Sequence, residues 1–392
     1  MIFTVFENQD QSLLFPLNQI KASFELRCGA FTNLERIKNS IDANDEIHLF
    51  VRDELKQVVQ IRHPDLKVNP DILSEGIWLN GAAIWSENSI KEIVSPKTYT
   101  NKGEILALHC EKSIPYEIAL DYMQQSASVS IELHIPFIHN SWDSIFLQSK
   151  IISQDAFHFI DLHHGKIHPS AIMENGDNIF IGKNVEIRPG VILDASFGPI
   201  ILSDNVYVDA GAIVQGPVFI GSSCVINPGS KLRKNISLGP LCKIGGELED
   251  CIFEGYSNKQ HDGFLGHCHI GEWVNLGANT NNSDLKNNYG LVRMQVKEDE
   301  IQTDHQFLGS IIGDYVRTGI STMLNTGTVI GLGANVFGSN FQPKYISPFS
   351  WGDDDKTELN KFFQIIETMK KRRNIELDES EKELLLKIYD LN

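Results

Sequence analysis

Residues 202–244 read LSDNVYVDAGAIVQGPVFIGSSCVINPGSKLRKNISLGPLCKI, and this stretch decides the fold. An α-helix repeats every 3.6 residues and a strand every two, so neither explains a sustained period of six. A parallel β-helix does, because each six-residue unit supplies one short strand and a corner, and three units complete a triangular coil. The aliphatic side chains with this period are Leu202, Val208, Val214, Ile220, Ile226, Leu232, Leu238 and Ile244.

The same period continues beyond residue 244, shifted by two positions, with Asn258 as a polar exception, and it restarts at Ile312. We therefore predict a β-helix over residues 165–351. Cys224 and Cys242 are one coil apart and should stack inside it as free thiols. The period is broken over residues 283–311, and insertions in repeat folds project from one face and often carry binding groups. A decorative loop or an oligomer contact is the alternative interpretation of this insertion.

The other parts of the chain show different patterns of apolar and polar residues. Residues 1–112 alternate apolar, strand-like runs with polar, helix-permitting stretches, which predicts a small α/β layered domain. Residues 113–164 contain two amphipathic stretches and are predicted to form a helical connector. Residues 352–392 are predicted to form a helical tail that caps the triangular prism of the β-helix. The basic run Lys370–Arg373 indicates a helix face exposed to solvent.

Composition excludes several classes of protein. The net charge of −17 disfavours nucleic acid and anionic membranes as partners. No apolar run approaches the roughly 18 residues of a membrane helix, and the first ten residues lack the basic region of a signal peptide. Six cysteines without a Cys-x-x-Cys pair fit a reduced, cytoplasmic protein. A histidine cluster (His158, His163, His164 and His168) lacks a convincing set of further ligands, so no metal site is predicted.

The richest polar cluster lies just before the broken repeat, around His261. A histidine that titrates near neutrality can take a proton from an amine or a hydroxyl, with His267 and His269 as alternative bases. Amide and phenol groups can hydrogen-bond a sugar, and lysines can hold a phosphate. No Ser-His-Asp or Cys-His spacing stands out, which favours direct transfer over a covalent intermediate. The substrate-binding candidates are Tyr256, Asn258, Lys259, Asn275, Asn279, Asn282 and Lys286.

The row of aliphatic residues from Leu202 to Ile244, called the aliphatic ladder below, is typical of the left-handed β-helix acyltransferases. The sequence also resembles these proteins in two segments, His261-Asp262-Gly263 and Asn275-Leu276-Gly277-Ala278-Asn279-Thr280. The whole chain is similar to the GlmU-like sugar-phosphate nucleotidyltransferase/acetyltransferase family. The resemblance implies the left hand of the β-helix, since parallel crossovers are right-handed by default. It also implies acetyl-CoA as co-substrate, a homotrimer with CoA between neighbouring subunits, and His261 as the catalytic base. Asn275 would then contact the sugar, Asn282 would lie in the segment around both ligands, and the cofactor would be lined by Ala278, Gly319, Ile320 and Gly338.

The N-terminal domain departs from that family's pattern. Active nucleotidyltransferases carry a glycine-rich phosphate loop after the first strand, whereas residues 7–12 here contain no glycine. The position expected to supply a Mg²⁺-binding aspartate is Ala82, which cannot ligate a cation. The sequence favours a degenerate nucleotidyltransferase-like domain, with Mg²⁺ required only if that domain is active.

Three hypotheses follow. The first is an acetyl-CoA-dependent N-acetyltransferase acting on an amino-sugar phosphate, with glucosamine 1-phosphate favoured, in the formation of a UDP-N-acetylglucosamine type of nucleotide sugar. The second is a sugar-1-phosphate nucleotidyltransferase, uridylyl or thymidylyl, that uses the N-terminal domain. The third is a non-catalytic trimeric scaffold that binds a sugar nucleotide.

Overall fold

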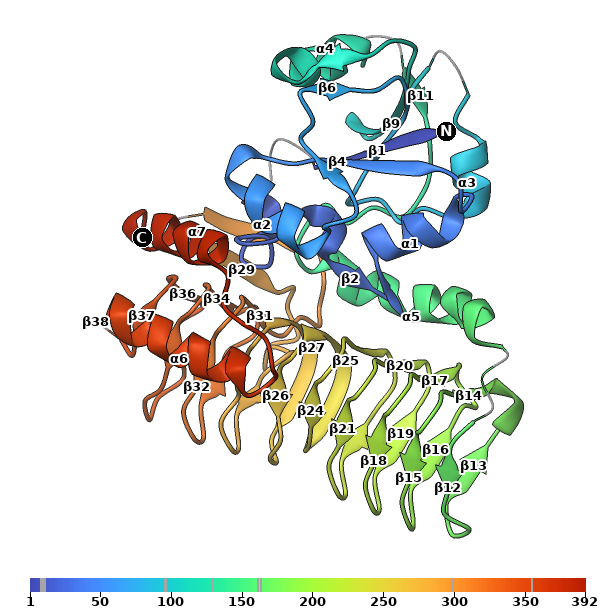
Figure 1. Cartoon of the computed structure of the whole chain (residues 1–392). Helices are drawn as coiled ribbons and strands as arrows, with labels where there is room; N and C mark the ends of the chain where they lie inside the picture. Colours follow the sequence, from blue (N-terminus) through green and yellow to red (C-terminus); the bar gives the residue numbers. More distant parts are fainter. Residues whose placement is uncertain are drawn as a thin grey trace.

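The computed structural model describes residues 1–7, 12–94, 97–127, 130–160, 162, 164–297, 299–353 and 355–392. An α/β domain lies along the side of a triangular prism, and two C-terminal helices lie against both (Figure 1). The predicted fold class, an α/β domain followed by a left-handed parallel β-helix and a helical tail, is confirmed.

The N-terminal domain is built on one seven-stranded sheet in the order β11-β8-β9-β7-β1-β4-β5. Its centre is parallel, and β9 pairs antiparallel with both β7 and β8. The strands are β1 (Ile2–Phe6), β4 (Glu46–Phe50), β5 (Lys67–Val68), β7 (Gly76–Asn80), β8 (Thr98–Asn101), β9 (Glu104–Cys110) and β11 (Ser130–Glu132). The helices are α1 (Asn33–Ser40), α2 (Lys56–Arg62) and α3 (Glu87–Lys91), and a small hairpin joins β2 (Arg27–Cys28) to β3 (Phe31–Thr32).

The segment expected to be a helical connector contains more than helices. It holds α4 (Ala119–Ser126) and α5 (Asp143–Asp155), close to the two predicted amphipathic stretches. It also holds β11, which extends the N-terminal sheet by pairing in parallel with β8. The sheet therefore continues past residue 112. The strand was not predicted because it is only three residues long and exposed throughout.

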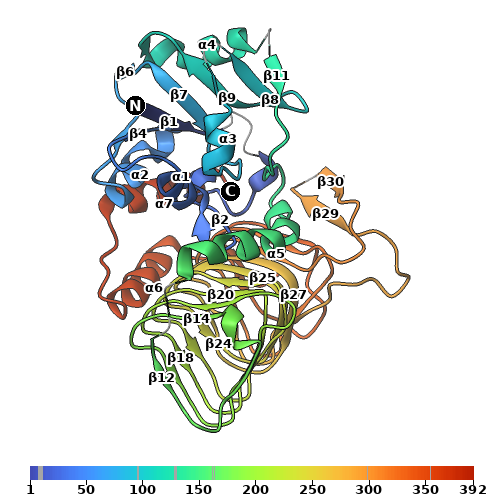
Figure 2. The same cartoon turned by 90° about the vertical axis from the view of Figure 1, so that its right-hand side faces the viewer.

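The prism has three faces of short parallel strands, and the end view shows the triangular coils stacked on one another (Figure 2). The first face comprises β12 (Lys166–Ile167), β15 (Glu186–Ile187), β18 (Tyr207–Val208), β21 (Val225–Ile226), β24 (Lys243–Ile244), β26 (Asn258–Lys259), β32 (Arg317–Thr318), β35 (Asn335–Val336) and β37 (Ser350–Trp351). The second comprises β13 (Ile172–Glu174), β16 (Ile192–Asp194), β19 (Ile213–Gln215), β22 (Lys231–Leu232), the first halves of β25 (Glu247–Gly255) and β27 (Phe264–Glu272), β28 (Asn281–Asn282) and β33 (Met323–Leu324). The third comprises β14 (Ile179–Ile181), β17 (Ile200–Leu202), β20 (Val218–Ile220), β23 (Ile236–Leu238), the second halves of β25 and β27, β31 (Ile311–Ile312), β34 (Val329–Ile330) and β36 (Tyr345–Ile346).

The interior of the prism is the predicted aliphatic ladder. All eight of its members from Leu202 to Ile244 are buried in one cluster, at most 1% exposed. Cys224 and Cys242 are buried there too, and both are free thiols, as predicted. Like side chains stack because each coil repeats the register of the one before.

This packing carries a stability prediction. Replacing Ile226 by alanine should lower the free energy of unfolding by about 2–5 kcal/mol, because it leaves a cavity among fully buried neighbours. Ile172→Ala is the matched control, since that side chain is 55% exposed and its loss should cost less than about 0.5 kcal/mol. Urea unfolding followed by circular dichroism measures both. Equal effects would contradict the assignment of the ladder to the core.

The N-terminal domain is bound to the third face of the prism, with α5 lying between them (Figure 2). Ser144 on α5 contacts the ring of His269, and Ser237 of β23 donates to the carbonyl of Gly29. The backbone N–H of Arg27 donates to the carboxylate of Glu254 over 2.9 Å. This face is therefore not free to solvent over these coils.

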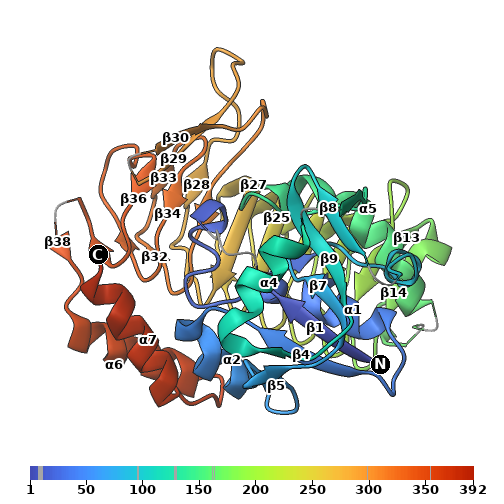
Figure 3. The ribbon, with the colours of Figure 1, turned by 90° about the horizontal axis from the view of Figure 1, so that it is seen from above.

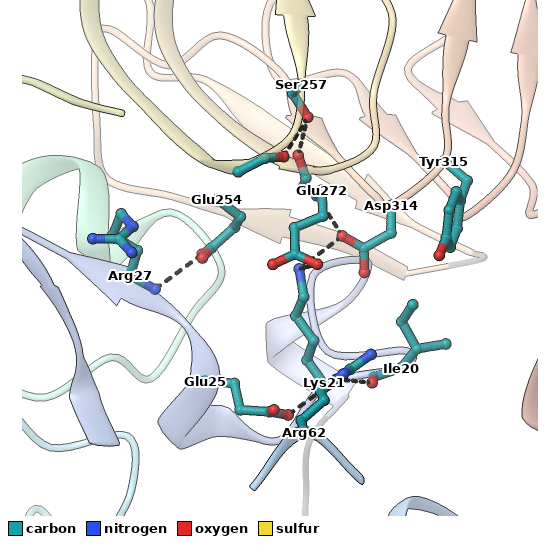
Figure 4. A network of polar contacts seen from close by, with 12 residues as sticks. Ile20, Lys21, Glu25, Arg27, Arg62, Glu254, Ser257, Glu272, Asp314 and Tyr315 are labelled. Carbon is teal, nitrogen blue, oxygen red and sulfur yellow. Dashed lines mark hydrogen bonds and ion pairs between the residues drawn. The ribbon is translucent and has the colours of Figure 1, made fainter. Parts of the chain in front are cut away.

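A buried ion network continues that contact toward the C-terminal end of the prism (Figure 4). The ammonium of Lys21 lies 2.9 Å from Asp314 and 3.5 Å from Glu272. Lys21 is 3% exposed and Asp314 is fully buried. The two carboxylates raise the pKa of Lys21 against the effect of its burial. The network joins the N-terminal domain to the prism, and removing one partner would leave a buried charge uncompensated.

The tail forms α6 (Leu359–Lys371) and α7 (Glu379–Asp390), which lie between the first face of the prism and the N-terminal domain (Figures 1 and 3). The predicted solvated helix face at Lys370–Arg373 is wrong in part. Lys370 is buried and ion-paired with Glu381, and Arg373 donates to the side chain of Asn258. The apolar side of α6 packs against the prism, and this packing brings the basic run at the end of the helix close to the prism.

The insertion at 283–311 leaves the prism between the second and third faces and returns at β31, which pairs with β27. Within it, β29 (Arg293–Val296) and β30 (Asp299–Gln302) form an antiparallel hairpin that projects from the prism (Figure 3). The predicted interruption therefore corresponds to a projecting excursion.

Candidate functional site

The corner after β26 carries His261, and an inward-turned lysine holds its backbone. Lys259 occupies the position of Ile244 one coil earlier, so its side chain enters the prism and is fully buried. Its ammonium donates to the backbone carbonyls of His261 and, over 2.9 Å, Asp262. In this geometry Lys259 is not available to a phosphate, contrary to the expectation. It shapes the loop that presents His261.

The position of Lys259 was missed because one coil is short. Lys243 pairs with Asn258 after 15 residues, whereas Val225 pairs with Lys243 after 18. The shortened coil moves Lys259 into the inward row and Asn258 to the outside. Asn258 is therefore no polar exception in the core.

Burial lowers the pKa of Lys259 from 10.5 to about 8. Between these values the unfolded chain holds a proton that the folded chain lacks, so this group makes the protein more stable as pH rises from about 8 to 10.5. Comparing wild type with Lys259→Met, we expect wild type to gain on the order of 1–3 kcal/mol more over this range. Urea unfolding at the two pH values measures the gain. Identical pH dependence in the two proteins would contradict a buried, proton-releasing lysine.

His261 is exposed at the corner between the first and second faces. Among the residues that the structure describes, none forms a hydrogen bond with its ring. The ring is thus open to a ligand from solvent.

The residues expected to line CoA lie on the same edge of the prism. The backbone N–H of Asn279 donates to Asp262 beside His261, and the N–H of Ser321 donates to the carbonyl of Ala278, each over 2.8 Å. Gly319 donates to Val336, directly before Phe337 and Gly338. His261, Ala278, Gly319 with Ile320, and Gly338 therefore follow one another on successive coils. Ile320 is 78% exposed and gives this edge an apolar surface.

Three of the substrate-binding candidates line a pocket of about 380 Å³ next to this edge. Asn258 and Asn275 stand in register on the first face, between Lys243 and Arg317. The ring of Tyr256 stacks on Trp273 with centroids 4.4 Å apart. The complete lining is Lys243, Tyr256, Asn258, Gln260, Trp273, Asn275, Arg317, Ile365, Met369, Arg372 and Arg373.

The other substrate-binding candidates lie elsewhere. Asn282 is 5% exposed, and its amide makes paired hydrogen bonds to the backbone of Gly266, so it is engaged within the chain. Asn279 is exposed on the edge and donates to Ser321. Lys286 lies in the insertion and donates to the carbonyl of Leu291 over 2.6 Å.

The two alternative bases are engaged in contacts within the chain. His269 is fully buried between the prism and α5, where its ring contacts Glu254 over 2.8 Å and Ser144 over 2.9 Å. His267 is half-buried, with its Nδ1 2.9 Å from Asp284 and its ring against Phe307. His261 is the histidine of this cluster whose ring faces solvent.

The cations that line the basic side of the pocket were not among the substrate-binding candidates. Arg372 and Arg373 are about a hundred residues from Asn275 and reach it only through the fold of the tail. Trp273, which lines the pocket, was also not among the candidates, although it stands only two residues before Asn275 in the sequence.

Comparison with known proteins gives a family match in the N-terminal part of the chain and partial matches to individual proteins. Residues 3–162 match a family model described as sugar nucleotidyl transferase. Over 143 residues the chain is 34% identical to a bifunctional sugar-1-phosphate nucleotidylyltransferase/acetyltransferase of Sulfurisphaera tokodaii, a match covering 36% of this chain and 35% of that protein. Over the matched residues the chain is therefore similar to GlmU-like bifunctional proteins. It is 35% identical over 102 residues to the bifunctional protein GlmU of Rippkaea orientalis, covering 26% and 21% of the two chains.

A third relative of this chain is an uncharacterized acetyltransferase, YaiX, of Escherichia coli, 29% identical over 150 residues, covering 38% of this chain and 65% of that protein. The matches span about a third of the first bifunctional relative and about a fifth of the second. The region matched by the family model extends beyond residue 112 and includes β11 and α5.

The position in the N-terminal domain that was expected to supply a Mg²⁺-binding aspartate holds no carboxylate. Ala82 is buried, and the amide of Asn80 beside it is engaged with Ala82 and Ile105. The described residues include no group of three histidine, cysteine or carboxylate side chains placed to hold a metal ion. Residues 8–11 of the glycine-free segment 7–12 lie outside the described residues. His163 of the histidine cluster lies outside them as well. No helix in the described part of the chain is both long and apolar enough to span a membrane.

Proposed function

We propose that the protein is an acetyl-CoA-dependent N-acetyltransferase that acts on an amino-sugar phosphate, with glucosamine 1-phosphate as the favoured acceptor. The single observation that carries the proposal is the shared edge, on which exposed His261 is followed coil by coil by Ala278, Gly319, Ile320 and Gly338. The pocket lined by Tyr256, Asn258 and Asn275 lies next to this edge, and it supports the proposal as the place for the sugar. The names of the relatives support acetyl transfer as the chemistry.

The proposed reaction is direct transfer. The neutral amine of the substrate attacks the thioester carbonyl, and the imidazole of His261 accepts the proton that the nitrogen loses. A C–N bond forms, the C–S bond breaks, and the CoA thiolate leaves and is protonated. No second nucleophile is required.

We further propose that the active form is a homotrimer in which CoA lies along the edge between neighbouring subunits. The apolar side chain of Ile320, 78% exposed in the single chain, would then be covered. Light scattering should give three times the chain mass of 44.0 kDa. A monomer that transfers acetyl groups would contradict this assembly. The free, buried cysteines support the cytoplasm as the proposed compartment.

Thiol release from acetyl-CoA tests the reaction. We expect release with glucosamine 1-phosphate, and none above background with glucose 1-phosphate, which lacks the amine. Weaker release with glucosamine would show that the phosphate is also recognised. Ligand-induced heat stabilisation without thiol release from any acceptor would favour a binding scaffold instead.

A second candidate function is favoured by the match of residues 3–162 to the sugar nucleotidyl transferase family. It is transfer of a uridylyl or thymidylyl group to a sugar 1-phosphate by the N-terminal domain. The assay is Mg²⁺-dependent pyrophosphate release from UTP or dTTP with a sugar 1-phosphate. This function ranks second because Ala82 stands where a Mg²⁺-binding aspartate was expected, and because residues 7–12 contain no glycine for a phosphate loop.

A further inference from the structure

The pocket between the first face and α6 is strongly basic in an acidic protein. Four of its lining residues are cations, Lys243, Arg317, Arg372 and Arg373, and none is an acid. The chain as a whole has a net charge of −17. Concentrating cations in one concavity is unfavourable unless an anion neutralises them.

The four cations lack partners of opposite charge. Across the described ranges, no carboxylate lies within ion-pair distance of any of them. The nearby carboxylates are ion-paired with other lysines. Glu272 is paired with Lys21, and Glu381 with Lys370. The Nε and Nη2 atoms of Arg317 are buried without a hydrogen-bond partner in the described part of the chain, and burial lowers its pKa. A buried guanidinium left in this state is costly, which indicates a missing ligand.

The geometry places these groups around one space. Lys243, Asn258, Asn275 and Arg317 pair in register on successive coils, so their side chains form one outward column. Residues of α6 and the turn after it cover the column, and Arg373 donates to Asn258 over 3.3 Å. The Tyr256–Trp273 stack forms an aromatic wall beside them, a surface suited to a sugar ring.

We propose that this pocket binds the phosphate group of a small-molecule ligand, with Arg317 at its floor and Arg372 and Arg373 supplied by the C-terminal tail of the same chain. Arginine is suited to this role because its fork of N–H donors matches phosphate oxygens. The inference rests on the proposed function only for the identity of the ligand, a sugar phosphate. Binding itself requires no acyl transfer.

Isothermal titration of the full-length protein tests the site with three probes: inorganic phosphate, glucosamine 1-phosphate and CoA. Arg317→Ala and the double change Arg372→Ala with Arg373→Ala should each weaken the binding of the preferred probe at least about tenfold. Two cations outside the pocket serve as controls, Arg188→Ala on the first face and Lys371→Ala on α6, and both should bind as wild type does. Binding should also weaken as salt rises.

The probes distinguish the source of the phosphate. Tighter binding of glucosamine 1-phosphate than of CoA, lost in Arg317→Ala, supports the pocket as a sugar-phosphate site. Tighter binding of CoA, lost in the same variant, supports a phosphate site that belongs to the co-substrate. Binding of every probe that is unchanged in both pocket variants, or absent at millimolar concentrations in wild type, overturns the proposal.

The two proposals fail separately. His261→Ala should bind phosphate as wild type does, because His261 does not line the pocket. A protein that binds phosphate through Arg317 but transfers no acetyl group would contradict the proposed reaction and leave the site standing. An active enzyme whose KM values for the sugar phosphate and for acetyl-CoA are both the same in Arg317→Ala would contradict the site and leave the reaction standing.

Discussion

His261→Ala should lower kcat for acetyl transfer to glucosamine 1-phosphate by about 10²–10⁴-fold, the usual contribution of a positioned general base. The proposed reaction needs a proton acceptor at the edge, and the other two histidines of the cluster are engaged with Asp284 and Glu254. The side chain of His261 is exposed, so its loss should leave the packing of the prism undisturbed. The fold should therefore be retained, with an unchanged circular dichroism spectrum.

His168→Ala is the matched control for that variant, because His168 is also exposed on the prism but lies in its first coil. It should keep wild-type kcat. Full activity in His261→Ala would contradict the assignment, and a loss confined to His267→Ala would transfer the role to the His267–Asp284 pair.

Lys21→Ala should lower the free energy of unfolding by about 3–5 kcal/mol, the usual cost of breaking a buried ion pair from one side. The change leaves the buried carboxylate of Asp314 and that of Glu272 without their shared cation. Among the described residues, one oxygen of Asp314 already lacks a hydrogen-bond partner, so the remaining network cannot compensate. Urea unfolding gives the loss, and limited proteolysis should show earlier cleavage between the N-terminal domain and the prism.

Lys91→Ala provides the comparison for Lys21. Lys91 is ion-paired with Glu87 on an exposed face of α3, where solvent screens both charges, so its removal should change stability little. Equal effects of the two changes would contradict the view that the Lys21 network holds the α/β domain against the prism.

The prism was predictable because its core repeats. Side chains such as Ile220 and Leu238 are fully buried at equal spacing, and one physical requirement recurs on every coil. The edge at His261 and Ala278 was found for a related reason, since the resemblance fixed its register.

Other features depended on local departures from the repeat or on contacts between distant segments. Lys259 turns inward only because one coil is three residues shorter than its neighbour, which the aliphatic pattern does not reveal. Asn282 is used to bond the backbone of Gly266. Arg372 and Arg373 belong to the pocket because α6 folds back along the prism, and the charge pattern of the tail alone indicated a solvated helix.

A crystal structure with CoA bound tests the central claim most directly. We predict that CoA lies along the edge formed by Ala278, Gly319, Ile320 and Gly338, with its sulfur next to the imidazole of His261 and its length between two copies of the chain. CoA bound far from His261, on another face or in the N-terminal domain, would contradict the proposed mechanism even though the fold stands.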